Sequence, residues 1–67
     1  MNITVNNNLM EVAEPCTLQQ LCSLIGIKEN EPVAVAIGMD VIERDSWSSI
    51  ILNENDNITI IRATCGG

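Results

Sequence analysis

The sequence has almost no aromatic residues and few basic ones. Trp47 is the one aromatic side chain among 67 residues, with no Phe and no Tyr. Lys28, Arg44 and Arg62 are the only basic residues against nine acidic ones, so the net charge is −6. Stacking of single-stranded nucleic acid needs aromatic rings, and phosphate binding needs clustered Lys and Arg. We therefore expect no nucleic-acid partner, whereas a basic partner surface would suit an acidic domain.

Histidine is absent, and the cysteines are few and widely spaced. Cys16, Cys22 and Cys65 include no Cys-x-x-Cys pair, and no His is available to complete a zinc site, so we predict no metal site. An odd cysteine count without a secretory signal argues against a disulfide framework. Cys16 and Cys22 are instead expected to pack as small apolar residues. No nucleophile and base stand at a plausible spacing, so we predict no catalytic residue and no enzyme activity.

Long hydrophobic runs are missing as well. The longest apolar run, Val33–Ile37, is far shorter than the roughly 20 residues that a membrane-spanning helix needs, so we expect no membrane partner. The start "MNITVNNN" lacks the basic region and the long apolar stretch of a secretory signal. We expect a cytoplasmic location, or the plastid stroma or matrix of an organelle.

Apolar residues make up 46% of the chain and are spread along it, which is typical of one small globular domain. Alternation of apolar and polar residues, bounded by turn residues, predicts strands. These strands are expected at residues 3–5, 9–13, 33–38, 41–42 and 58–64. Asn6 to Asn8 form a turn between the first two, because Asn tolerates a positive φ. The first two strands therefore form a hairpin.

One helix is predicted at residues 17–25. Thr17 is a good N-cap, with Gln20 at the capping-box position. Apolar residues then recur at spacings of three and four, and Gly26 is a natural stop. Residues 43–52 are less regular: Asp45 or Ser46 could cap a single helical turn, and Trp47 and Leu52 are expected to anchor this segment on the core.

This order of elements predicts an α+β domain. The compact solution is a mixed sheet of four to five strands with one helix packed across one face. The last strand can pair in parallel with the first. In that sheet Ala34, Ala36, Ile61 and Ala63 face away from the helix and leave a smooth outer surface.

The chain ends in Cys65-Gly66-Gly67. Gly averages about 7% of residues, so two terminal glycines arise by chance only about 0.5% of the time. A tail without side chains can thread a narrow channel and adopt backbone angles closed to other residues. We therefore divide the chain into a domain at residues 1–64 and a flexible tail at residues 65–67.

Four stretches carry a resemblance to a known family: "MNITVNN", "TLQQLCSLIGI", "VAVAIGMDVIERDSW" and "LNENDNITIIRATCGG". With the Arg-x-x-Trp at Arg44–Trp47, the acidic turn at Asp56 and the Gly-Gly end, the whole chain resembles the ThiS family of sulfur-carrier proteins. These are ubiquitin-like β-grasp domains of thiamine biosynthesis. Cys65 departs from the family pattern, where an aliphatic residue or Gln is more usual.

The resemblance implies a protein co-substrate rather than an enzyme. The Gly67 carboxylate would be adenylylated with ATP by a ThiF-like adenylyltransferase and then thiocarboxylated. A cysteine desulfurase would be the sulfur donor, and thiazole synthase (ThiG) would take the sulfur for the thiazole ring. The carrier itself would hold no cofactor.

The resemblance also implies where the partners bind. In ubiquitin-like domains the outer sheet face meets the activating enzyme, so Ala34, Ala36, Ile61 and Ala63 would form the partner surface. Arg62 either steers the tail toward an acidic groove or the nucleotide phosphates, or is a solvated charge at a strand end. Cys65 is interpreted as an exposed substitute for a small residue, or as a transient carrier of sulfur.

Two other functions stay open from the sequence. One is a carrier of the molybdopterin synthase small-subunit type, which shares the fold and the Gly-Gly end; those chains are usually longer, and the Arg-x-x-Trp points away from them. The other is an interaction module that binds through its sheet and never reacts. Deleting Gly66 and Gly67 would leave the partner affinity of such a module unchanged.

Overall fold

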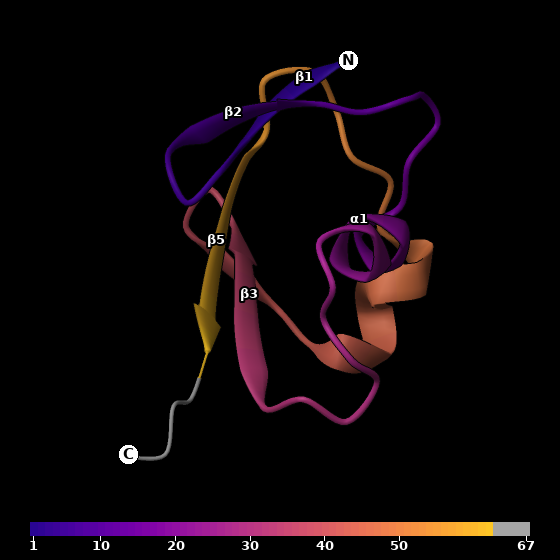
Figure 1. The fold of residues 1–67 in the computed structure, drawn as a ribbon, viewed down its shortest axis with the longest axis vertical. Coiled ribbons are helices and arrows are strands. Elements are labelled where there is room, and N and C mark those ends of the chain that lie inside the picture. The colour runs from indigo at the N-terminus through magenta and orange to yellow at the C-terminus, as the bar shows by residue number, and fades with distance from the viewer. Residues whose placement is uncertain (63–67) are drawn as a thin grey trace.

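The computed structural model describes residues 1–62. Along this part of the chain lie β1 (Asn2–Val5), β2 (Asn8–Glu11), α1 (Leu18–Leu24), β3 (Val33–Ile37), β4 (Asp40–Ile42), the 3-10 helix η1 (Arg44–Ser49) and β5 (Asn57–Arg62). The strands form one sheet in the order β2-β1-β5-β3-β4. Figure 1 shows α1 and η1 on the same side of this sheet. The predicted α+β architecture is confirmed.

Strand β5 is the centre of the sheet. It pairs in parallel with β1 and antiparallel with β3, so the last strand lies beside the first as predicted. The two outer pairs, β1–β2 and β3–β4, are antiparallel hairpins. In Figure 1, β5 runs from the end of the molecule that holds the N-terminus toward the opposite end. The residues that follow Arg62 therefore start from the end of the molecule far from residue 1.

Both hairpins have two-residue turns that need a positive φ. Asn6 and Asn7 have φ values of 49° and 69°, and Val5 pairs with Asn8, which is the arrangement of a type I′ turn. Asn is the residue other than Gly that adopts this region most readily. In the second hairpin Gly38, with φ 62°, takes the first turn position between Ile37 and Asp40. These turns fix the register of the two hairpins.

Helix α1 is capped as the sequence predicts. The side chain of Thr17 accepts a hydrogen bond from the Gln20 N–H at 3.1 Å, and the Gln20 side chain accepts one from the Thr17 N–H at 2.8 Å. Leu18, Leu21 and Cys22 are buried on its inner face. Gly26 follows the helix with φ 90°, a conformation that costs other residues strain. A seven-residue helix is marginal alone, so its packing on the sheet holds it in place.

The hydrophobic core lies between the sheet and the two helices. Its buried members are Ile3, Val12, Cys16, Leu18, Leu21, Cys22, Ile27, Val35, Trp47, Leu52, Ile58 and Ile60. Trp47 and Leu52 anchor the η1 segment on this core, and Cys16 and Cys22 pack within it, as expected from the sequence. Fully burying an aliphatic side chain stabilises a fold by about 1.5–3 kcal/mol, so this core is the main source of stability.

Several predicted strand boundaries differ from the structure by one residue, and two boundaries were wrong by more. Strand β2 ends at Glu11 rather than at Ala13: Val12 exchanges its last pairing bonds with Met1, and Pro15 has no N–H to continue the ladder. Helix η1 begins earlier than predicted, with Glu43 as N-cap, and neither Asp45 nor Ser46 caps it. The predicted end of the last strand, at residue 64, and the boundary between domain and tail lie outside the described residues.

Candidate functional site

The predicted tail and one predicted surface residue lie outside the described residues. They are Ala63, Cys65, Gly66 and Gly67. The structure therefore bears on the candidate site through the end of β5, the strand that leads to these residues, and through the sheet face around it. The assignment of Ala63 to the outer surface, and of Cys65, Gly66 and Gly67 to a reactive tail, therefore rests on the sequence.

Ala34, Ala36 and Ile61 lie on the sheet face away from α1. Ala34 is paired with Ile61 across β3 and β5, while their neighbours Val35 and Ile60 point into the core. Ile61 is 64% exposed, Ala34 is exposed and Ala36 is half-buried. These three residues therefore lie on the sheet face that the sequence predicted for them.

Val41 is a fourth apolar residue on this face, and sequence reasoning missed it. It is paired with Ala36 across β3 and β4 and is 73% exposed. The two-residue turn at Gly38 and Met39 fixes that register. Recognising this turn in the sequence could have predicted that Val41 lies opposite Ala36, on the outer face. We call Ala34, Ala36, Val41 and Ile61 the outer patch. An apolar cluster on one exposed face is typical of a docking surface.

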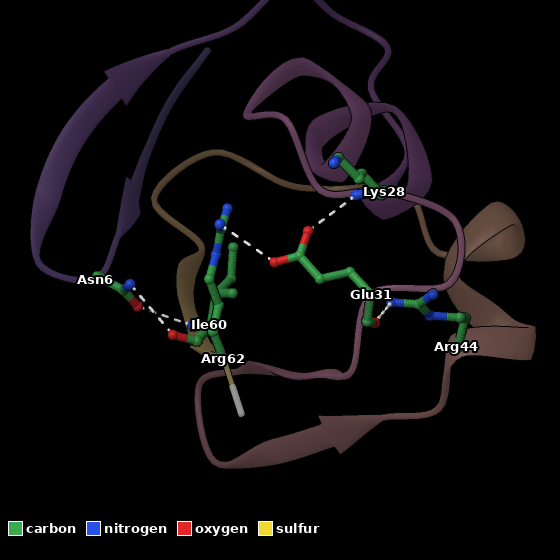
Figure 2. Close-up of polar contacts among 6 residues, drawn as sticks. All are labelled: Asn6, Lys28, Glu31, Arg44, Ile60 and Arg62. Atoms are coloured by element: carbon green, nitrogen blue, oxygen red, sulfur yellow. Dashed lines mark hydrogen bonds and ion pairs between the residues drawn. The ribbon is translucent and has the colours of Figure 1, made fainter. Parts of the chain in front are cut away.

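Arg62 lies on the opposite side of β5 from Ile61, toward α1. It is paired with Val33, which packs against the core, and its guanidinium forms an ion pair with Glu31 at 3.2 Å. The same carboxylate accepts a hydrogen bond from the Lys28 N–H at 3.1 Å (Figure 2). About half of the Arg62 side chain is exposed, so the pair contributes less than about 1 kcal/mol. Arg62 is therefore not part of the outer patch.

The Arg44-x-x-Trp47 motif connects η1 to the loop before β3, and we call this connection a brace. The guanidinium of Arg44 donates to the carbonyls of Glu29 and Glu31, the second at 2.6 Å. It also stacks over the Trp47 ring, 4.6 Å from its centroid, because residues three apart align on a 3-10 helix. Trp47 donates its indole N–H to the Ile42 carbonyl at 3.1 Å. From the sequence, this motif was recognised as a feature of the family, but its structural role was not predicted.

Ionisable groups within residues 1–62 offer no obvious reactive centre. Burial raises the pKa of the Cys22 thiol above its ordinary value of 9.0, and the nearby charge of Arg44 offsets this in part. A thiol in that state is a poor nucleophile near neutral pH. Among these residues no three metal-binding side chains come together, and no helix is long and apolar enough to cross a membrane. Within residues 1–62 the candidate site is therefore the outer patch beside the end of β5.

Comparisons with known proteins identify the family. The family model for the ThiS family matches residues 3–67. The crystal structure of the thiamine biosynthesis protein ThiS from Geobacter metallireducens is similar, with a TM-score of 0.83, 28% identity and full coverage of both chains.

An NMR structure of a thiamine biosynthesis protein from the same organism has a TM-score of 0.81 and 26% identity. The match covers all of this chain and 88% of that one. A comparison with curated protein sequences gives no match. Because the family match spans almost the whole sequence and the fold agrees with it, the chain belongs to the ThiS family of thiamine biosynthesis proteins.

Proposed function

We propose that this protein is a sulfur carrier that is adenylylated and then thiocarboxylated at Gly67. The observation that carries the proposal is the ThiS family match, which extends through the Gly-Gly end. A carboxylate oxygen of Gly67 attacks the α-phosphorus of ATP, and pyrophosphate leaves. Hydrosulfide (HS⁻) then attacks the acyl carbon, AMP leaves with the electron pair of the broken C–O bond, and the remaining S–H proton is lost to solvent. The product is a thiocarboxylate, and its sulfur goes to the thiazole ring of thiamine.

Other proteins supply the chemistry in this proposal. A ThiF-like adenylyltransferase binds ATP, a cysteine desulfurase provides sulfur that a thiol reductant releases as hydrosulfide, and thiazole synthase (ThiG) consumes the sulfur of the thiocarboxylate. The carrier contributes a docking surface and a terminal carboxylate, and it needs no bound cofactor. The acidic character of the domain, with a net charge of −6, favours partners with basic surfaces near the site.

The position of the outer patch supports docking beside the reacting end. Five residues follow Arg62 and end at Gly67. A chain of five residues spans at most about 18 Å. An enzyme that reacts with Gly67 must therefore cover surface close to the end of β5, where Ile61 and Ala34 lie. A small apolar patch there lets a partner bind without desolvating charged groups.

The test is the intact mass of the protein after incubation with ATP, its activating enzyme and a sulfide source. We expect one oxygen to be replaced by sulfur, and we expect no change for a variant that lacks Gly66 and Gly67. That variant should keep the unfolding midpoint of the full chain. An unchanged mass, with an activating enzyme competent on a known carrier, would contradict the proposal and favour a non-reactive interaction module.

A second measurement separates the two kinds of carrier. The thiocarboxylated protein is offered to thiazole synthase and to the large subunit of a molybdopterin synthase. We expect it to bind and supply the first. Sulfur transfer to the second alone would assign the protein to molybdopterin synthesis instead.

A further inference from the structure

The side chain of Asn6 holds the main chain of β5 near its end. Its Nδ2 donates to the Ile60 carbonyl at 3.3 Å, and its Oδ1 accepts from the Ile60 N–H at 2.8 Å. Figure 2 shows the amide facing the backbone of Ile60 across the gap between the β1–β2 turn and β5. A primary amide offers one donor and one acceptor side by side, which is what a strand backbone requires.

These two bonds replace main-chain pairing that β1 cannot provide. The parallel ladder runs from the Thr4 N–H to the Asp56 carbonyl and from the Asn6 N–H to the Ile58 carbonyl. In a regular ladder the next bond would join the Ile60 N–H to the main-chain carbonyl of residue 6. Asn6 has φ 49° and turns the chain toward β2, so its side-chain oxygen takes that position. The side-chain amide thus continues the hydrogen bonding between β1 and β5 by one more position.

Without Asn6, the end of β5 would be paired on one side only. On its other side β3 pairs with β5 as far as Arg62. On the β1 side the backbone pairing covers only Asn57 and Ile58. A strand end held on one side moves more freely than one held on both. The Asn6 bonds therefore fix the main chain two residues before Arg62, from which the chain continues to Gly67.

We propose that Asn6 is a positioning residue for the reaction at Gly67, because its amide holds the main chain of β5 at Ile60, shortly before the C-terminal residues. The inference rests on the proposed function. It assigns Asn6 no contact with ATP, sulfur or a partner's reacting atoms. Its effect is to raise the fraction of docked carriers whose terminal carboxylate reaches the partner's active site.

The test compares substitutions at two neighbouring Asn residues of the same turn. Asn6→Gly removes both bonds and accepts the positive φ, and Asn6→Asp keeps the acceptor but loses the donor. Asn7 has φ 69°, and its side chain bonds to no described residue, so Asn7→Gly and Asn7→Asp are matched controls. We expect faster hydrogen exchange at the Ile60 amide in Asn6→Gly, by about fivefold, than in Asn7→Gly.

The kinetic measurement is thiocarboxylation by the activating enzyme at varied carrier concentration. We expect Asn6→Gly and Asn6→Asp to lower kcat by about fivefold, the effect of one typical hydrogen bond, while KM stays within about twofold. The unchanged KM follows because the outer patch is intact. A merely destabilised carrier would lower the active concentration and raise the apparent KM instead.

The outcomes separate this inference from the proposed function. If the wild-type chain is not thiocarboxylated, the proposed function fails and the inference fails with it. If the wild type reacts and both Asn6 variants match their Asn7 controls in kcat, the inference alone is overturned. It is also overturned if exchange at Ile60 is unchanged in Asn6→Gly. A lower kcat with unchanged KM and faster exchange supports it.

Discussion

Among residues 1–62, Cys22 is the residue at which burial most clearly alters an ionisable group. Its side chain is 1% exposed on the inner face of α1, and burial raises its pKa above 9.0. The cause is desolvation, because a thiolate loses its hydration inside the core. The charge of Arg44 acts in the opposite direction without cancelling the effect. The neutral thiol therefore behaves as a small apolar side chain.

This pKa shift predicts how stability depends on pH. In the unfolded chain Cys22 loses its proton near pH 9.0, whereas in the folded protein it keeps the proton to higher pH. The unfolded state then binds fewer protons, so the free energy of unfolding falls as the pH rises above 9.0. Cys22→Ala removes this contribution. We expect the stability advantage of the wild type over Cys22→Ala to shrink above pH 9.0 in urea titrations followed by Trp47 fluorescence.

A core substitution without a titrating group is the control for this prediction. Ile58 is fully buried, and Ile58→Val should cost about 1 kcal/mol at every pH. The prediction would be contradicted if the difference in free energy of unfolding between wild type and Cys22→Ala stayed constant from neutral pH to well above 9.0. The difference for Ile58→Val is expected to stay constant in this way.

At the scale of elements, η1 and the loop before β3 are held together by one side chain. Arg44 binds two carbonyls of that loop, at Glu29 and Glu31, and stacks on Trp47. Glu31 in turn pairs with Arg62 at the end of β5. The loop contains no helix or strand, so Glu31 is held by these contacts and by its hydrogen bonds with the main chain of Lys28. A planar guanidinium suits both the fork of donors and the stacking, whereas an ammonium group does not.

Arg44→Lys is therefore expected to destabilise the protein although it keeps the charge. The loss of one carbonyl bond and of the stack should lower the free energy of unfolding by about 1–2 kcal/mol. Urea unfolding followed by Trp47 fluorescence measures this. Arg62→Lys is the matched control, since its surface ion pair should change stability by less than about 0.5 kcal/mol. If Arg44→Lys and Arg62→Lys lowered the free energy of unfolding equally, the role of Arg44 as a brace would be refuted.

At the scale of the whole molecule, the sheet order places the outer patch beside the end of β5. Strands β3, β4 and β5 are neighbours, so residues distant in sequence, such as Ala34 and Ile61, form one surface. The opposite face is covered by α1 and η1 and holds the core (Figure 1). One face thus packs the core, and the other exposes Ala34, Val41 and Ile61.

Ala34→Glu tests whether the outer patch binds the activating enzyme. Because Ala34 is exposed, the substitution should change the free energy of unfolding by less than about 0.5 kcal/mol. Burying the new charge against a partner is costly, and we expect KM for the carrier to rise at least about tenfold. Ala13→Glu makes the same change at an exposed position after β2, away from the patch, and should leave KM unaltered. A similar KM for both variants would show that the patch is not the docking surface.

The local structure and the family were predictable from short stretches of the sequence. Turn residues such as Asn6 and Asn7, the capping box of Thr17 and Gln20, and the alternation in β3 and β5 are local signals, because each depends on residues a few positions apart. They predicted the α+β fold and the outward position of Ala34 and Ile61, and the sequence also placed Cys16, Cys22, Trp47 and Leu52 in the core. The Gly-Gly end predicted the reactive terminus, which stays a prediction.

The side chains that join distant segments could be identified only from the three-dimensional packing. The Asn6 amide meets Ile60 across 54 positions, Arg44 meets Glu31 across 13, and Arg62 turns away from the outer patch toward Glu31. No periodicity encodes such contacts, since they depend on the register between strands and on the path of a loop without repeats. The same applies to Val41, which joined the patch once the β3–β4 register was fixed. Local physics specified the elements, and their packing specified which residues hold the end of β5.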